Sequence, residues 1–278
     1  MIPHIQTTQF NKRQLTLVTI VVTIIILLVI TISGLFIGPS ELGINLQNKS
    51  QPPSLRHLFG TDWLGRDMFA RTLKGLTLSF RVGLFAAIFS VLIALIFSLL
   101  SSWSKVADGI ITWMIDLFLS IPHIVSLILI SFVLGGGGKG VVIGIALTHW
   151  PSLARLLRAE ILQIKSSEYI NVSTKLGKSF SWIVIHHYIP NLMPQLFVGL
   201  VLLFPHAILH EAAITFLGFG LSTESPAIGI ILSESMQYLS TGMWWLACFP
   251  GLSLLIMISA FELLGKSINR FIHPYYGR

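Results

Sequence analysis

The sequence predicts an all-α protein that crosses a membrane six times. Of its 278 residues, 54% are hydrophobic and only 10% are charged, whereas soluble domains carry roughly a quarter charged residues. The apolar residues gather in six long runs separated by polar segments, which is typical of a polytopic membrane protein. The single cysteine, Cys248, excludes an internal disulfide and a cysteine-based metal cluster.

The first apolar run follows a short polar lead, residues 1–14. Residues 15–37 carry no charge, and at about 1.5 Å per residue this run is long enough to cross the hydrocarbon core. A signal peptide has a shorter apolar core of roughly 7–15 residues before a small-residue cleavage site. Ser33 and Gly34 imitate such a site, but the apolar run is too long, so we expect a retained first span.

An extracytoplasmic segment, residues 38–75, separates this span from a core of five further spans, residues 76–265. Prolines break the segment, and within it Asp62 and Arg66 are four residues apart, so on a helix they can pair across one turn. Pro122 interrupts the third span, which a membrane helix tolerates when neighbouring helices satisfy the freed carbonyl. The expected spans of the core are residues 76–100, 110–134, 141–157, 196–216 and 244–264.

Six spans place both termini on the same side of the membrane. Most basic residues outside the spans share that side, including those of the tail, residues 266–278, and the positive-inside rule makes it the cytoplasm. This arrangement also accounts for the net charge of +7, which in a soluble protein would suggest nucleic-acid binding. The segment 38–75 departs from the rule because its basic residues outnumber its acidic ones. These are Lys49, Arg56, Arg66, Arg71 and Lys74, against Glu41, Asp62 and Asp67.

A polar helix is expected in the loop between spans four and five, residues 166–190. Its apolar residues recur at steps of three or four, which places them along one face of a helix. They are Tyr169, Val172, Leu176, Phe180 and Ile183. Pro190 and Pro194 then mark the start of a new helix that leads into span five. The helix falls in the cytoplasm, where it either only connects two spans or is presented to a partner outside the bilayer.

Two enzyme motifs begin in this sequence but are not completed. His210 and Glu211 start the metalloprotease pattern H-E-x-x-H, but Ile214 occupies the position of the second histidine. The glycine run that ends at Lys139 resembles a phosphate-binding loop, but Gly140 follows where a serine or threonine is required. The chain therefore has no evident means of hydrolysing ATP, and energy for active transport must come from a partner.

Polar groups inside span five are the remaining candidates for function. His206, His210 and Glu211 lie in an otherwise apolar helix, and the two histidines are one turn apart. Ionisable groups at membrane depth are costly and usually face a pathway or a partner, and two imidazoles can contact a transition-metal ion. Alternatively, each histidine donates to a carbonyl of a neighbouring helix and Glu211 pairs with a basic residue. His149 in span four can join the same lumen, although alone it better suits helix packing.

Four blocks of sequence carry a specific pattern in combination. They are Gly60-Thr-Asp-Trp-Leu-Gly-Arg-Asp67, Glu168-Tyr169 to Leu176-Gly177 with Pro190-Asn191, Glu211-Ala-Ala-Ile-Thr-Phe-Leu-Gly-Phe-Gly220, and Phe249-Pro-Gly-Leu252 with Ala260-Phe-Glu-Leu-Leu-Gly265. Together these blocks resemble the inner-membrane permease subunits of ATP-binding-cassette (ABC) importers for dipeptides, oligopeptides and nickel. The resemblance covers nearly the whole chain after the first span.

Two further stretches are similar to the C-type permease of nickel importers. They are Ile145-Ala-Leu-Thr-His-Trp150 with Ala154-Arg155, and the pair His206 and His210 ahead of Phe216-Leu-Gly-Phe-Gly220. The resemblance implies the type I ABC importer permease fold, in which the loop helix is a coupling helix seated in a groove of the ATPase. It also implies a second, B-type permease, two ATPases that hold ATP and magnesium, and an extracytoplasmic binding protein.

Within the coupling helix, the resemblance extends to individual residues. Its matching positions are Glu168, Tyr169, Val172, Ser173, Leu176 and Gly177. The family commonly has Glu-Ala-Ala where this chain has Asn171-Val172-Ser173, so the contact with the ATPase is expected to differ in detail. Gly177 is retained, and glycine readily adopts the backbone angles of the turn that ends a helix.

The sequence thus predicts a permease subunit in the lipid of a bacterial plasma membrane, with both termini cytoplasmic. It is expected to catalyse no reaction, hold no cofactor and bind no nucleic acid. The expected cargo is nickel or a related divalent ion, free or chelated, and a dipeptide or oligopeptide is the alternative cargo. A passive channel without ATPase coupling is the alternative of another class. The predicted pathway residues are His149, His206, His210 and Glu211, with His206 and His210 as the metal contacts.

Overall fold

The computed structural model describes residues 12–272, and this part of the chain is helical apart from its loops and one isolated β-bridge between Thr61 and Asp67. Most of the predicted lead and the last part of the predicted tail lie outside the described residues. The helices are α1 (Lys12–Phe36), α2 (Met68–Ser101), α3 (Lys105–Ser120), α4 (His123–Val133), α5 (Gly137–Lys165), α6 (Glu168–Lys175), α7 (Phe180–Ile183), α8 (Ile189–Phe216), α9 (Ile228–Met236) and α10 (Trp245–Ile272).

Five helical stretches are long and apolar enough to cross a membrane, which confirms the predicted all-α polytopic fold. They are Gln14–Phe36, Met68–Ser101, Gly137–Lys165, Phe180–Phe216 and Trp245–Phe271. A sixth crossing is possible only if α3 and α4 count as one span.

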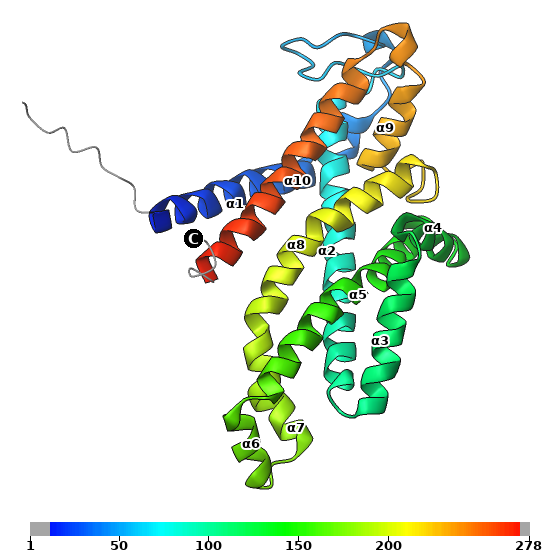
Figure 1. Ribbon diagram of the computed structural model, residues 1–278. Helices are drawn as coiled ribbons and strands as arrows, with labels where there is room; N and C mark the ends of the chain where they lie inside the picture. Colours follow the sequence, from blue (N-terminus) through cyan, green and yellow to red (C-terminus); the bar gives the residue numbers. More distant parts are fainter. Residues whose placement is uncertain (1–11, 273–278) are drawn as a thin grey trace, which may run out of the picture.

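The third predicted span is broken rather than continuous. The axes of α3 and α4 differ by 98° across the break. Ile121 has ψ 136 and Pro122 begins the next helix. A proline pushes the residue before it out of the helical region and lacks the N–H that a continuing helix would need. The chain therefore turns sharply here, and α4 does not extend the axis of α3 (Figure 1).

Helix α2 lies at the centre of the bundle and packs against α5, α8, α1 and α3 (Figure 1). Small residues let its neighbours approach closely, as is common between membrane helices. Gly83 is one of them, since a Cβ added there would lie 2.7 Å from Cγ1 of Ile208 on α8. Helices α5 and α8 approach each other in the same way, because a Cβ on Gly199 would lie 2.8 Å from Cδ1 of Leu153.

The segment before span five also differs from the sequence prediction. Residues Phe180–Phe216 form one helical stretch of 37 residues with a π turn at Val184–Tyr188. The helical stretch of span five therefore begins before Pro190, where the prediction had placed its start. Pro190 instead occupies the first turn of α8, where its missing N–H costs no hydrogen bond. The apolar face predicted from Tyr169 to Ile183 is therefore divided between α6 and the start of this long helix.

The two ends of the bundle carry different elements (Figure 1). At one end α6 and α7 lie beside the turn between α2 and α3, where Lys165 Nζ donates to the Ser102 carbonyl at 3.2 Å. At the other end the segment 38–67 lies beside α9 and the start of α10, and Trp245 Nε1 donates to the Thr61 carbonyl at 3.3 Å.

Asp62 holds the segment 38–67 in place through a buried charge network. Its side chain is fully buried and accepts from Arg66 Nε at 2.6 Å and from Arg71 Nη1 at 2.8 Å. Arg71 also pairs with Glu234 of α9 at 2.9 Å. The predicted pairing of Asp62 with Arg66 is therefore present, but in a loop. The network places part of the segment's positive charge beside the buried carboxylate of Asp62 and the partly exposed carboxylate of Glu234.

Candidate functional site

The first candidate site is a cavity of about 740 Å³ between α3, α4, α5 and α8. Most of its lining is apolar, and all four histidines that lie in the spans face it: His123, His149, His206 and His210. The other polar groups of its lining are Ser120, Thr148, Ser152 and Gln195. A concave apolar site with a few convergent polar groups is the usual form of a ligand site.

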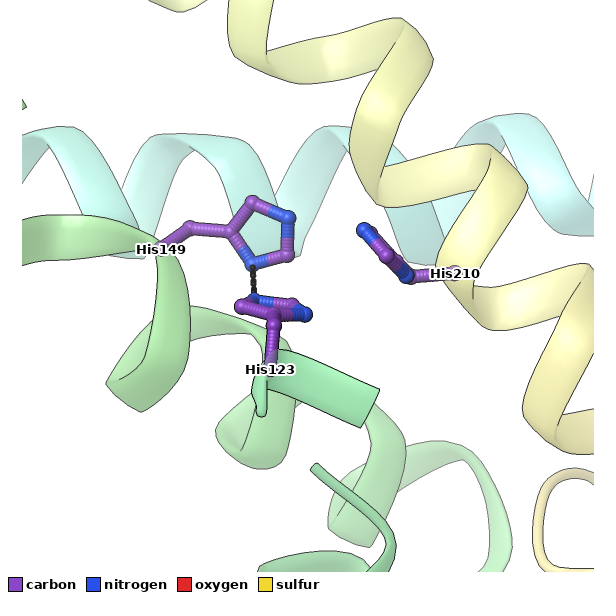
Figure 2. A group of neighbouring side chains, drawn as sticks. All are labelled: His123, His149 and His210. Atoms are coloured by element: carbon purple, nitrogen blue, oxygen red, sulfur yellow. Dashed lines mark hydrogen bonds between the residues drawn. The ribbon is translucent and has the colours of Figure 1, made fainter. Parts of the chain in front are cut away.

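Three of these histidines converge from three different helices. His123 comes from the first turn of α4, His149 from α5 and His210 from α8, and one ring nitrogen of each lies within 4.8 Å of the others. His123 Nε2 is 3.1 Å from His149 Nδ1. Figure 2 shows the rings of His123 and His149 side by side, both facing the ring of His210. We call these three residues the histidine cluster.

The ring of His149 is fixed by the backbone of its own helix. Its side chain is almost fully buried, and Nδ1 lies 3.0 Å from the Ile145 carbonyl. A carbonyl oxygen only accepts, so the proton of this bond is on Nδ1 and the lone pair of the neutral ring is on Nε2. A backbone carbonyl that accepts from one ring nitrogen is a common support for a histidine whose other nitrogen is a metal ligand.

The predicted metal contacts, His206 and His210, do not both belong to the histidine cluster. His206 lines the cavity, but it lies one helical turn from His210 along α8 and is not in the cluster. His123 was not predicted, because a proline in an apolar run does not show how sharply the chain bends or where the next residue lies. A histidine directly after a proline inside an apolar run was the available signal.

Glu211, which was predicted to line the pathway, is not among the residues that line this cavity. Its side chain is fully buried, and its Oε1 accepts from Thr215 Oγ1 at 3.0 Å. Neighbouring residues of a helix point about 100° apart, so His210 and Glu211 face different surroundings. Nor does Glu211 pair with a basic residue through any contact among the described residues.

The second candidate site is the exposed face of α6. Ile170 is buried and anchors the helix to a cluster with Ile164 and Tyr188. Tyr169 and Val172 point outward instead, with 44% and 55% of their surface exposed, and Leu176, which follows the last turn, is 73% exposed. A short helix thus presents apolar side chains to its surroundings at one end of the bundle.

The remaining predicted coupling residues fix the ends and the orientation of α6. Glu168 lies in the first turn, where a negative charge is favourable. Ser173 Oγ donates to the Tyr169 carbonyl at 2.9 Å and lies 3.0 Å from His187 Nε2 on the following helical segment. Gly177 has φ +75, and the N–H groups of Gly177 and Lys178 donate to the Thr174 and Ser173 carbonyls. This is the Schellman arrangement that ends a helix.

The bundle of membrane-crossing helices and its largely apolar cavity with a few polar groups indicate the class of protein: a membrane-embedded transport component. Residues 86–277 match the family model described as "Binding-protein-dependent transport system inner membrane component". The chain belongs to this family, and it is an inner-membrane permease component of an ABC transporter that is not itself catalytic.

Relatives along nearly the whole chain carry permease names. The chain is 32% identical over 270 residues to the dipeptide transport system permease protein DppC of Alkalihalophilus pseudofirmus, covering 96% of this chain and 88% of the relative. It is 31% identical over 267 residues to the oligopeptide transport system permease protein OppC of Bacillus subtilis, covering 96% and 87%. These names confirm the predicted permease family and do not support the predicted nickel subtype.

Solved structures agree on the fold. The inward-facing MetNI methionine ABC transporter superposes with a TM-score of 0.58 at 17% identity, covering 73% of this chain and 96% of that one. An amino acid ABC transporter solved with histidines gives a TM-score of 0.56, also at 17% identity, with 73% and 94% covered.

Proposed function

We propose that this chain forms one half of the translocation pathway of an ATP-driven importer, and that α6 is the element on which the ATPase acts. The cargo class that its relatives support is a peptide or a peptide-like compound. The other half of the pathway is a second permease, ATP and magnesium are held by two ATPase subunits, and a binding protein delivers the cargo from outside.

The exposed apolar face of α6 carries this proposal. Tyr169, Val172 and Leu176 are about half exposed or more, and removing apolar surface from water is worth about 25 cal/mol per Å². A protein partner that covered them would gain that stabilisation. A helix that only connected two spans would have no use for three such side chains pointing away from the bundle.

The position of α6 suits it for transmitting movement. It directly follows α5 and, through Gly177 and α7, precedes α8. These two long helices carry His149 and His210 on the wall of the cavity. Ile170 packs into the same buried cluster as residues of both helices, so a force applied to α6 reaches the pathway through packed side chains.

The orientation of the chain in the membrane follows from the positions of its basic residues and from the location of the ATPase. Lys165, Lys175 and Lys178 lie at the α6 end, and basic residues beside membrane spans favour the cytoplasm, where ATP is available. With α6 in the cytoplasm, the segment 38–67 and α9 face outward, towards the binding protein.

The test is the substitution Val172→Asp in the chain co-expressed with its partner permease and ATPases. A charge in the covered apolar contact should lower the amount of co-purified ATPase at least tenfold and abolish ATP-dependent dipeptide uptake in proteoliposomes. Leu55→Asp is the control, because Leu55 is 99% exposed and lies in the segment at the opposite end. It should leave ATPase association unchanged. Unaltered association in Val172→Asp, or uptake that needs neither ATPase nor ATP, would exclude the proposal.

A further inference from the structure

We propose that the histidine cluster is a transient coordination site for a divalent transition-metal ion that passes through the cavity. This rests on the proposed function, since it names the cargo of the same pathway. Neutral imidazole is a preferred ligand of zinc, copper, nickel and iron ions. His123, His149 and His210 supply three such ligands from three separate helices, so sequence neighbourhood does not account for their convergence.

The geometry is close to that of a bound site without being closed. Metal–imidazole bonds of about 2.0–2.1 Å bring the nitrogens of a tetrahedral site to about 3.3 Å from one another. The cluster nitrogens lie within 4.8 Å, so modest rotations of the imidazole rings would complete the site. An open arrangement suits a transport pathway, because cargo that binds too tightly is not released.

Packing alone does not explain the hydrogen bonding of the cluster. The Nδ1 atom of His123 is buried and has no hydrogen-bond partner among the described residues, which is costly for a polar atom away from water. His149 donates from Nδ1 to the Ile145 carbonyl and keeps its Nε2 lone pair. Both rings face His210 (Figure 2). Because His149 Nδ1 keeps its proton, the facing Nε2 of His123 carries the lone pair of that ring and its Nδ1 carries the proton. A metal ion between the rings would bind the Nε2 lone pairs of His123 and His149, and the Nδ1–H of His123 would stay available to an acceptor on the cargo.

The charges around the cavity indicate the form in which the ion travels. Among the described residues that line it there is no aspartate, glutamate, lysine or arginine. Three neutral imidazoles offer a dication no compensating charge, and an unpaired ion in an apolar site is strongly disfavoured. On this chain's half of the pathway nothing supplies the negative charge, so we expect it to come with the cargo, as the carboxylates of a chelator.

The size of the cavity agrees with a chelated ion. Its volume of about 740 Å³ far exceeds the roughly 30 Å³ occupied by one water molecule in the liquid. An amino-acid-like or peptide-like chelator would fill such a space, with Ser152 and Gln195 as polar contacts. The cargo class is therefore a divalent metal in a small anionic chelate with open coordination positions. Such a compound is chemically close to the peptides after which the relatives are named.

The experiment is a cobalt titration of the untagged full chain in nanodiscs, followed by the visible absorption bands of Co²⁺. Two probes are compared: Co²⁺ alone, and Co²⁺ nitrilotriacetate, an anionic chelate with open coordination positions. We expect one chelate to bind per chain with a spectrum shifted by imidazole nitrogen. His149→Gln and His210→Gln should each weaken binding at least tenfold. His186→Gln is the matched control, because His186 lies outside the cavity on the π turn, and it should not change binding.

The outcomes separate this inference from the proposed function. Absence of cobalt binding, or equal binding in a His123→Gln, His149→Gln and His210→Gln triple variant, overturns the metal site. If those variants still co-purify the ATPase, the proposed function stands. Tighter binding of bare Co²⁺ than of the chelate would overturn the charge argument. If Val172→Asp retains its ATPase while the cluster binds cobalt, the proposed coupling fails and the site remains.

Discussion

The turn at Gly177 offers a test of coupling that does not alter the apolar contact itself. Gly177 has φ +75, and a Cβ added there would meet nothing within 4 Å. A side chain therefore causes no clash, and its whole effect comes from the left-handed backbone, which costs an L-residue about 1–2 kcal/mol. That cost corresponds to a factor of about 5–30 in the population of the native turn.

The expected series follows from how well each residue tolerates this conformation. Gly177→Asn should be mild, because asparagine visits the left-handed region more readily. Gly177→Ala should lower ATPase co-purification and coupled uptake by about 5–30-fold. Gly177→Val should be worse still, since a β-branched residue with positive φ is a genuine outlier. The amount of chain in the membrane should remain unchanged throughout, because the bundle does not depend on this turn.

Gly218 supplies the matched control. It has φ +85, a Cβ there would also meet nothing within 4 Å, and it ends α8 with the same pattern of backbone hydrogen bonds. Gly218→Val should therefore strain the chain equally without disturbing ATPase association. The turn has no role in coupling if Gly177→Val associates and transports like the wild type, and backbone strain is not the cause if Gly177→Asn is as damaging as Gly177→Val.

Two further predictions concern stability, measured as the midpoint of thermal unfolding in detergent. Asp62→Ala removes one of the two carboxylate partners of the buried Arg71 guanidinium, which keeps only Glu234, and should cost about 1–3 kcal/mol because a buried donor loses its acceptor. An unchanged midpoint would show that the network is not structural. Gly83→Val places a side chain against Ile208 and should cost about 1–3 kcal/mol by overpacking. Gly109→Val, which meets nothing within 4 Å, should cost less, and equal losses in the two variants would attribute the effect to helix propensity instead.

The sequence predicts best what depends on composition and local pattern. The uncharged run 15–37 corresponds to α1, and its length alone is sufficient to predict a span. Gly177 was expected to end the polar helix, and its positive φ confirms the turn. By contrast, the apolar residues from Tyr169 to Ile183 were predicted to form one helical face, but α6 ends within this stretch. Helical periodicity depends only on residue spacing, so it does not show that a glycine with positive φ ends the helix.

The cluster lies beyond local prediction because its members are distant in the chain. Residues 206 and 210 look like a pair at a spacing of four, but His210 instead joins His123 and His149. The sharp bend at Pro122 decides this outcome. A proline in a membrane helix is compatible with anything from a slight kink to a complete break, and neighbouring helices determine which occurs.

The two candidate sites are connected in a way that would give the proposed coordination site a means of release. His149 and His210 lie on α5 and α8, the two helices that flank α6 in the chain, whereas His123 lies on α4 beyond the break at Pro122. On the proposed function, a displacement of α6 by the ATPase moves α5 and α8 relative to α4. The three nitrogens must approach to about 3.3 Å to hold an ion, and this movement would separate them. A cycle of ATP hydrolysis would therefore alternate capture of the ion with its release.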